Sequence, residues 1–266
     1  MYAINVAVEK GYVKVLQWFN DSIYELKYSN YTLIRAAVND RVEILDWFSK
    51  SKYEFKYTKY AINGAAENGH IDVLEWFARV SLPVNKDAPI YKFKYSSDAI
   101  DFAADCGHIH VLEWFDKSNY EFKYTAYAID SAAENGDIDI LEWFNNSKHE
   151  FKYSPAAIDF AAAFGRIKVL EWFHNSKYIL KYNDFAINSA AANGHINVLQ
   201  WFKNSSLEFK YTHLAIDNAA EKGYVNVLDW FYNSTYNFKY TKYAIINARK
   251  NNHTNVLEWF NTHNMT

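Results

Sequence analysis

The chain is poor in residues that mark several classes of protein. Of its 266 residues, one is cysteine and three are proline. The single cysteine, Cys106, excludes a disulfide within the chain and is typical of a reducing compartment. No apolar run approaches the ~20 residues that a membrane-spanning helix requires. Because the first residues open directly into a repeated pattern, we expect no signal peptide and an intracellular, cytoplasmic protein.

An excess of charge of either sign is also missing. Lysine and arginine number 28, aspartate and glutamate 31, and the net charge is −3 with the basic residues dispersed. Binding to nucleic acid or to an anionic membrane requires clustered basic residues, so we expect neither partner. No nucleophile–base pair, phosphate loop or acid pair stands out from the sequence, which predicts that the protein is not an enzyme and binds no cofactor.

Aromatic residues, by contrast, make up 19% of the chain, and they recur at fixed positions. Each tryptophan follows Leu and one acidic or amide residue, and precedes Phe. Seven of the eight spacings between consecutive tryptophans are 29 residues, and the spacing from Trp76 to Trp114 is 38. A fixed period of this size indicates one small unit copied in tandem. We interpret the tryptophans as a buried structural spine, made of Trp18, Trp47, Trp76, Trp114, Trp143, Trp172, Trp201, Trp230 and Trp259.

The repeated unit predicts a helix, a tight turn, a second helix and an extended linker. In the third repeat, Thr58 is a typical helix N-cap and Gly69 a typical helix C-cap. Apolar residues at helical spacing follow Gly69, and the linkers alternate apolar and charged residues. Helices this short need neighbours on which to bury their apolar faces. We therefore predict an all-α solenoid of nine stacked helix-turn-helix repeats of 29 residues, forming a single domain over 1–266.

The stretch Ala65–Leu74 resembles the centre of an ankyrin repeat, in which Ala-Ala-x-x-Gly-His precedes an apolar second helix. The same phrase recurs at 103–109 and 190–196. The resemblance implies an ankyrin-like fold of stacked helix pairs. Units with Val-Leu-Glu-Trp-Phe and the linker Phe-Lys-Tyr are also similar to divergent ankyrin-like arrays of giant DNA viruses of amoebae. That similarity implies a viral protein acting in the host cytoplasm.

The chain departs from the ankyrin pattern at two points. Its period is 29 residues rather than about 33, which predicts a tighter turn between repeats. The family's Thr-Pro-Leu-His opening is missing, and an aspartate or asparagine stands where the family has its histidine. We expect these side chains to form hydrogen bonds between neighbouring loops, at Asn63, Asp101, Asp130, Asp159, Asn188 and Asp217.

The 38-residue spacing predicts a nine-residue insertion between repeats 3 and 4, within about 78–92. Two of the three prolines, Pro83 and Pro89, lie here and predict a loop, since proline donates no backbone hydrogen bond. The apolar residues of this loop either contact a partner or fold back on the array. As partner-binding residues we single out Arg79, Leu82, Val84, Lys86, Ile90 and Tyr91.

Phe164 is a further candidate for partner binding. It precedes the turn glycine, at a position held by asparagine in repeats 3, 5 and 7, so it is expected to face solvent. An exposed phenylalanine either anchors a partner or is an ordinary surface residue. Phe102 and Phe160 alternate with small residues in neighbouring repeats, which predicts packing of large against small side chains.

Two other groups carry possible chemistry. Cys106, His108 and His110 are of metal-ligand type, but they are the local copy of the Gly-His turn, and we expect no metal. A lysine recurs in the linkers and could form a stripe that binds phosphate or an acidic partner. We instead expect ion pairs with the acidic residues before most tryptophans. These lysines are Lys27, Lys56, Lys94, Lys123, Lys152, Lys181, Lys210 and Lys239.

These patterns predict a non-catalytic protein–protein interaction scaffold that presents a concave surface of first helices and linkers, together with the inserted loop, to a protein partner. The alternative is a structural component that packs end to end in a particle or filament. In the last repeat, Arg249, Lys250 and Asn252 replace Ala, a small residue and Gly, as expected of a solvent-facing cap. The cap favours a discrete scaffold and a monomer, whereas the first repeat carries little of a cap and leaves end-on assembly open.

Overall fold

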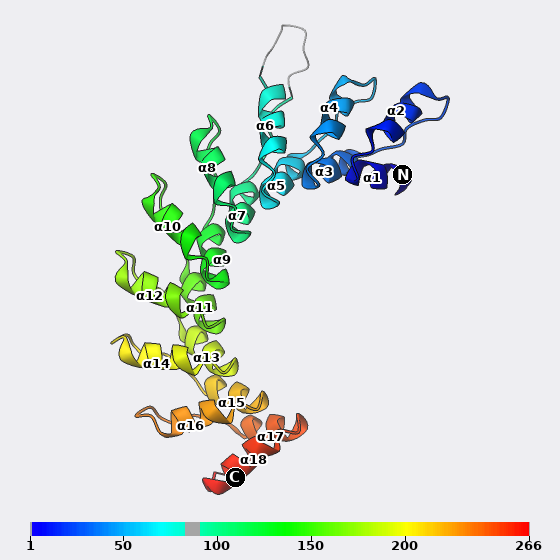
Figure 1. The fold of residues 1–266 in the computed structure, drawn as a ribbon. Helices are drawn as coiled ribbons and strands as arrows, with labels where there is room; N and C mark the ends of the chain where they lie inside the picture. Colours follow the sequence, from blue (N-terminus) through cyan, green and yellow to red (C-terminus); the bar gives the residue numbers. More distant parts are fainter. Residues whose placement is uncertain (1, 83–90, 266) are drawn as a thin grey trace. The chain divides into compact units, whose positions relative to one another are not determined.

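The computed structural model describes residues 2–82 and 91–265. Eighteen helices and no strands lie in these ranges, with two helices for each repeat (Figure 1). The prediction of an all-α helical-repeat fold is confirmed. The helices divide into two compact units, Met1–Ala128 and Ile129–Thr266, and the boundary falls inside a helix. Among the described residues, no helix combines the length and the apolar character needed to cross a membrane.

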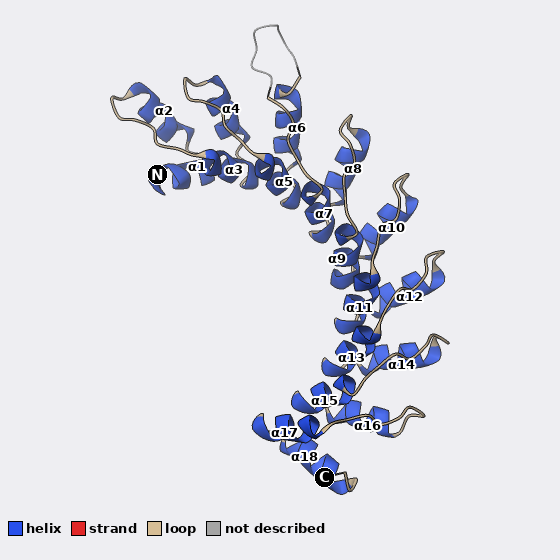
Figure 2. Cartoon of the chain, turned by 180° about the vertical axis from the view of Figure 1, so that it is seen from behind, coloured by secondary structure: helices blue, strands red, loops and turns tan. Residues whose placement is uncertain are grey.

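In each unit the first helices of successive repeats lie side by side in one row (Figures 1 and 2). Their facing positions are alanines, such as Ala65 and Ala103, whose side chains are completely buried. Small side chains allow this close approach of helix backbones. The first helices are α1 (Tyr2–Glu9), α3 (Asn30–Val38), α5 (Lys59–Glu67), α7 (Asp98–Asp105), α9 (Tyr127–Asn135), α11 (Pro155–Ala163), α13 (Asp184–Ala192), α15 (Leu214–Glu221) and α17 (Lys242–Lys250).

The second helices form another row in each unit and contact one another more sparsely (Figures 1 and 2). Each packs an apolar face on the first helix of its own repeat and turns polar residues outward. They are α2 (Val13–Asp21), α4 (Val42–Lys50), α6 (Ile71–Val80), α8 (Ile109–Lys117), α10 (Ile138–Asn146), α12 (Ile167–Asn175), α14 (Ile196–Asn204), α16 (Val225–Tyr232) and α18 (Thr254–Thr262).

The turn between the two helices of a repeat passes through a left-handed residue, as the glycine pattern predicts. The backbone φ of Gly69 is 74°. Repeats 2 and 9 lack the glycine and place Asp40 and Asn252 there, with φ of 56° and 60°. Asparagine and aspartate tolerate this conformation better than other residues with a side chain. The same turn geometry is therefore kept without glycine.

The completely buried aromatic row lies one residue beyond the tryptophans. The phenylalanine that follows Trp is at most 1% exposed in repeats 2 to 9. Of the tryptophans, Trp76 and Trp259 are buried, Trp18 is 55% exposed, and the others are half-buried. The expected spine of nine buried tryptophans is therefore corrected to a spine of Phe48, Phe77, Phe115, Phe144, Phe173, Phe202, Phe231 and Phe260.

Four tryptophans donate their indole N–H to a residue of the preceding repeat, whereas that of the buried Trp76 has no partner. Trp172 Nε1 donates to Glu142 Oε1 at 2.5 Å, and Trp259 Nε1 donates to Asp229 Oδ1 at 2.6 Å. Two glutamines play the same part, since Gln17 accepts from Trp47 and Gln200 from Trp230. In these four pairs the acidic or amide residue before one tryptophan is the acceptor for the next, a role that could not be predicted from the sequence.

Tyrosines in the linkers join neighbouring repeats through their hydroxyl groups. Tyr153 donates to the backbone carbonyl of Ile179 at 2.6 Å, and Tyr182 donates to that of Glu208 at 2.5 Å. The tyrosine rings also make cation–π contacts with lysines. Lys181 Nζ lies 4.7 Å from the Tyr153 ring centroid, and Lys239 Nζ lies 4.5 Å from the Tyr211 ring centroid. Such cation–π contacts contribute about 0.5–1 kcal/mol each at exposed sites.

These contacts correct the expected pairing of the linker lysines. Lys123 and Lys210 form ion pairs of 3.5 Å with Glu121 and Glu208, two residues earlier in the same linker. Lys123 also lies 4.6 Å from the centroid of the Tyr95 ring in the preceding linker. Of the expected partners, the acids before the tryptophans, Glu142 and Asp229 accept from indoles. Asp46 and Glu113 form ion pairs with lysines of their own helices. The linker lysines Lys123 and Lys210 therefore contact residues of the linkers, and not the acidic residues that precede the tryptophans.

The expected hydrogen bonds between neighbouring loops are confirmed. Asp130 Oδ1 accepts from the Ser154 backbone N–H at 2.9 Å, and Oδ2 accepts from Ser154 Oγ at 2.5 Å. Asn188 makes the same contact in amide form, since Oδ1 accepts from Thr212 N and Nδ2 donates to Thr212 Oγ1. We call these paired contacts Asx clamps. They fix the start of each following first helix, and they are made by Asn63, Asp101, Asp130, Asp159, Asn188 and Asp217.

Candidate interaction surface

The outward side of the first helices carries exposed apolar side chains. We define the first-helix face by the second, sixth and tenth residues after each repeat's capping position, since side chains four apart lie on one side of a helix. At the second position, six residues are 44–57% exposed: Tyr31, Tyr60, Tyr127, Phe185, Leu214 and Tyr243. The core positions of the same helices are filled by other residues, so these side chains are not required for the core.

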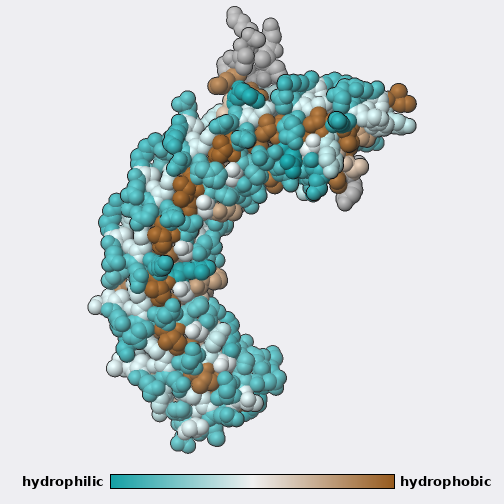
Figure 3. Space-filling view, in the orientation of Figure 1, coloured by the Kyte–Doolittle hydropathy of each residue, from teal (hydrophilic) through white to brown (hydrophobic). Residues whose placement is uncertain are grey.

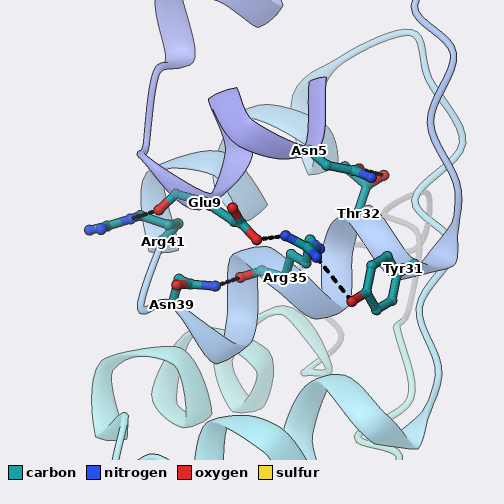
Figure 4. A network of polar contacts seen from close by, with 7 residues as sticks. All are labelled: Asn5, Glu9, Tyr31, Thr32, Arg35, Asn39 and Arg41. Atoms are coloured by element: carbon teal, nitrogen blue, oxygen red, sulfur yellow. Dashed lines mark hydrogen bonds and ion pairs between the residues drawn. The ribbon is translucent and has the colours of Figure 1, made fainter. Parts of the chain in front are cut away.

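In the first two repeats this face is occupied by polar contacts, shown in Figure 4. Arg35 forms an ion pair with Glu9 on the neighbouring helix and donates to the Tyr31 hydroxyl at 3.1 Å. Arg41 Nε donates to the Glu9 backbone carbonyl at 2.8 Å. The charged groups of α1 and α3 are thus turned toward each other, which leaves little apolar surface between them.

Repeats 6 and 7 present a different face. On α11 and its C-cap, Phe160 is half-buried and Phe164 is 46% exposed, and on α13 Phe185 is 45% exposed. The rings of Phe160 and Phe185 meet edge to face, with centroids 5.8 Å apart. We call these three residues the Phe patch. The predicted exposure of Phe164 is confirmed, and Phe160 also contacts an aromatic residue of the next repeat.

Near their C-terminal ends, the two helices of the Phe patch lack a glutamate that other first helices carry, although Asp184 is exposed in the first turn of α13. Repeats 3, 5 and 8 carry glutamate two residues before the turn glycine, and repeats 6 and 7 carry Ala163 and Ala192 there. The one acidic residue of α11, Asp159, is buried in an Asx clamp. A helix that is apolar on all sides is normally buried on all sides. The outward side of α11 and the patch-bearing side of α13 are exposed.

The insertion begins beside a groove between α6 and α8. Arg79 is exposed in the last turn of α6, and Leu82 is 63% exposed. Both line an open groove of about 430 Å³ together with Trp114 and Tyr120. The other expected contact residues of the loop, Val84, Lys86 and Ile90, lie outside the described residues.

Tyr91 belongs to the packing of the repeats. Its ring lies 4.8 Å from that of Phe55 in the preceding linker, and burial raises the pKa of its hydroxyl. The same pair recurs as Phe93 with Tyr120, at 4.0 Å. Tyr91 therefore occupies a regular repeat position, and its expected place on the exposed loop is corrected. Nine added residues then correspond to 82–90.

Similar grooves recur between successive second helices. Those between α2 and α4, α10 and α12, and α14 and α16 have volumes of about 380, 500 and 410 Å³. Each is lined by the tryptophan of the later repeat and by polar residues, and each is open to solvent. Figure 3 shows apolar residues on one face as small groups separated by hydrophilic ones. Grooves of this kind suit single side chains of a partner better than an enclosed small molecule.

The histidines of the Cys106 region are used within the stack. His110 Nε2 lies 3.0 Å from the Gly69 backbone carbonyl, and burial lowers the pKa of His108. Cys106 is exposed, and partial burial followed by the charges of Asp105 and Glu67 raises the pKa of its thiol. A raised pKa disfavours the thiolate, which is both the nucleophile and the metal ligand. Within the described part of the chain, no group of three or more His, Cys, Asp or Glu side chains is arranged to hold a metal ion.

Comparison with known proteins adds no relative: no protein-family model matches the chain, and no curated protein matches it. The Phe patch and the edge formed by Arg79 and Leu82 are the candidate surfaces for binding a partner. The first lies on α11 and α13 and the second at the end of α6, in different units of the chain.

Proposed function

We propose that the protein is a non-catalytic protein–protein interaction scaffold with ankyrin-like repeats. Its first-helix face is the docking surface, and the Phe patch is the main anchor for a protein partner. The edge formed by Arg79 and Leu82 is a second contact, to which the inserted loop belongs. The residues that recur in every repeat build the scaffold, so recognition rests on positions where the repeats differ.

One observation carries this proposal. Phe164 and Phe185 are exposed on helices whose core-facing residues, such as Ile158 and Ile187, are already completely buried. Exposing an apolar ring to water is unfavourable. The fold does not require it here, because other repeats have Asn at the position of Phe164 and Tyr at the position of Phe185. Exposed aromatic residues that cluster in this way are typical of interaction sites.

The absence of catalysis is part of the same proposal. The buried carboxylates are engaged in Asx clamps, and burial raises the pKa of Asp101, Asp130 and Asp159. These groups fix helix starts, and they face the neighbouring repeat rather than a cleft. This arrangement supports a structural role for the strongest candidates for acid–base chemistry.

End-to-end assembly into a filament is the second candidate function, and one residue opposes it. Arg249 is exposed in α17, at a position where every other repeat has a small apolar residue that is completely buried against its neighbours. Stacking another unit there would bury an arginine without a prepared partner, at a cost of several kcal/mol. The polar end of the last repeat therefore supports a discrete scaffold.

The resemblance to arrays of amoebal giant viruses supports a further proposal, that the scaffold acts in the cytoplasm of a host cell. The single cysteine is consistent with a reducing compartment.

The proposal is tested by capture with matched baits. Phe160→Ser with Phe164→Asn introduces residues that other repeats carry at these positions, as in Ser131 and Asn135. The fold is therefore expected to survive. Phe102→Ser, at the position of Phe160 but in another repeat, is the control. Quantitative capture from extracts of the source cell, or of the host if the chain is viral, should show a partner that binds the intact chain and the control but not the double variant. Identical capture by all three baits would refute the docking surface.

A further inference from the structure

The junction between repeats 2 and 3 has no Asx clamp. Ile34 of α3 stands at the position that holds asparagine or aspartate in repeats 3 to 8, and isoleucine cannot accept a hydrogen bond. The hydroxyl that a clamp would bind here is Thr58 Oγ1, which is buried and has no hydrogen-bond partner. At the equivalent position, Thr125 and Thr241 each donate to a clamp aspartate, at 2.8 and 2.6 Å. The start of α5 is therefore not fixed by the preceding repeat.

A second polar group at this junction is buried without a partner. It is the indole N–H of Trp76, whose expected acceptor is the residue before the preceding tryptophan, Asp46. Asp46 instead forms an ion pair of 2.6 Å with Lys50 of its own helix. A buried polar group without a partner has lost its hydrogen bonds to water and gained none in return. Opening of the junction restores water to both groups, so both favour the open state.

Apolar packing and a few polar contacts hold this junction closed. Val38 of α3 lies against Gly64 of α5, where an added Cβ would meet it at 2.6 Å. His70 Nε2 lies 2.9 Å from the Val38 backbone carbonyl oxygen. In the linker, Phe55 and Tyr57 contact the ring of Phe77 on α6, with centroids 6.4 and 4.7 Å apart. The end of the linker therefore belongs to repeat 3, and the junction lies between it and α4.

The junction between repeats 1 and 2 is joined more strongly, as Figure 4 shows for α1 and α3. Glu9 of α1 forms an ion pair with Arg35, and its backbone carbonyl accepts from Arg41 Nε at 2.8 Å. The second helices are joined as well, because Trp47 Nε1 donates to Gln17 at 3.0 Å. Repeats 1 and 2 thus share the polar contacts that the next junction lacks.

We propose that repeats 1 and 2, from α1 to α4, open from repeat 3 as one segment, and that this junction is a built-in opening point of the first unit. In an array whose repeats contact only their neighbours, the weakest interface decides where the array opens. Proteins open locally in contiguous cooperative segments of unequal stability. The opened state presents the side of α5 around Gly64, which Val38 of α3 covers in the closed array.

The test is hydrogen exchange of the full chain, followed by mass spectrometry of its proteolytic fragments. Helices α1 to α4 should share one protection factor, at least about tenfold lower than that of α5 and α6. Fraying from the end of the array would give a different result, in which α1 and α2 are less protected than α3 and α4.

A substitution that supplies the missing clamp makes the test specific. Ile34→Asp places an acceptor before the Thr58 hydroxyl and backbone N–H, as Asp101 does for Thr125. It should raise the protection of α1 to α4 about tenfold, the effect expected of one restored buried hydrogen-bond pair. Ile34→Ala is the control, because it removes the same side chain without supplying an acceptor, and it should not raise protection.

A second pair of variants keeps the test decisive if Ile34→Asp does not fold. Thr58→Val removes the unpaired hydroxyl and keeps the shape of the side chain, so it should raise the protection of α1 to α4. Thr241→Val makes the same change at a clamped position and breaks the bond to Asp217. It should instead lower the protection of α17 and α18.

The outcomes are distinct. A common low protection in α1 to α4, raised by Ile34→Asp or Thr58→Val and not by Ile34→Ala, supports the opening point. Equal protection of α3 to α6 in the parent chain, or graded fraying from the end, would overturn it. So would a folded Ile34→Asp chain with unchanged protection, or lower protection of α1 to α4 in Thr58→Val.

Discussion

At the residue scale, each Asx clamp depends on matching donors and acceptors. A hydroxyl at the capping position can donate to aspartate or accept from asparagine, and both forms occur, in Asp130 with Ser154 and in Asn188 with Thr212. An asparagine at the capping position is more restrictive. Asn183 donates through Nδ2 to Asp159 at 2.5 Å while its Oδ1 accepts from the Phe185 backbone N–H. Its orientation is fixed, so its partner has to be an acceptor.

This difference predicts opposite results for the same substitution at two clamps. Asp130→Asn should leave the free energy of unfolding within about 1 kcal/mol of the parent, because Ser154 Oγ can accept from the new amide. Asp159→Asn should cost about 1–3 kcal/mol, because its amide would face the amide of Asn183 and leave a buried donor unpaired. Urea unfolding of both variants checks the prediction. Equal losses at the two sites would show that charge, and not donor matching, governs the clamps.

The clamp carboxylates also predict a pH dependence. Burial raises the pKa of Asp130 in the folded state, so the folded protein binds this proton more tightly than the unfolded chain. Its contribution to stability is therefore greatest below the unfolded pKa of about 3.9 and declines as pH rises through the folded pKa. Asp130→Asn removes this dependence. The stability of the variant relative to the parent should increase from pH 3 to pH 7, and a decrease would contradict the assigned direction.

At the element scale, the second helix holds two aromatic residues with unequal roles. Phe173 on α12 is completely buried, whereas Trp172 is half-buried and stacks on Phe151 and Tyr178. Phe173→Ala should cost about 3–5 kcal/mol, as for other buried phenylalanines, and Trp172→Ala about half of that. Chemical denaturation of the two variants measures the difference. A larger loss of unfolding free energy in Trp172→Ala than in Phe173→Ala would show that the tryptophans, and not the phenylalanines, stabilise the stack most.

The linker at the insertion makes another element-scale prediction. Ser81 and Tyr91 correspond to Lys52 and Tyr53 of the preceding repeat, so removing 82–90 restores the regular period. Because Tyr91 already packs on Phe55, the shortened chain should keep its helical circular dichroism. Under the proposed function, it should bind a partner that uses the loop edge at least tenfold more weakly, about 1.4 kcal/mol. Loss of helical structure on deletion would make the loop part of the scaffold.

The helix pair, its turns and its caps could be predicted from the sequence because each has a local signal. Gly69 at the turn and the Asx clamp residues are examples, since period and residue type alone indicate them. The orientation of Trp against Phe could not be predicted, because both are apolar and adjacent, and only packing between repeats decides which is enclosed. Phe164 was found as a departure from the repeat. Phe185 was missed, although the loss of glutamate at Ala163 and Ala192 was a visible signal.

At the scale of the whole molecule, the repeats have similar residues at their buried positions and different residues at their surfaces. Buried positions such as Phe144 and Phe231 hold the same residue type in each unit. The differences lie at the two ends of the array, at the edge of the insertion and on the first-helix face. A repeat array can change such residues with little effect on stability, because each repeat contacts only its neighbours. Among these, we expect the Phe patch to carry recognition of the partner.

The role of the Phe patch can be measured as the affinity of the captured partner, once purified, for three chains. Isothermal titration calorimetry should give a Kd for the parent and for Phe102→Ser that agree within about twofold. For Phe160→Ser with Phe164→Asn, the Kd should be at least tenfold higher, with unfolding of the free variant unchanged. Removal of two apolar anchors from a contact has this size of effect or more. An unchanged Kd in the double variant would show that the partner binds elsewhere and would contradict the account.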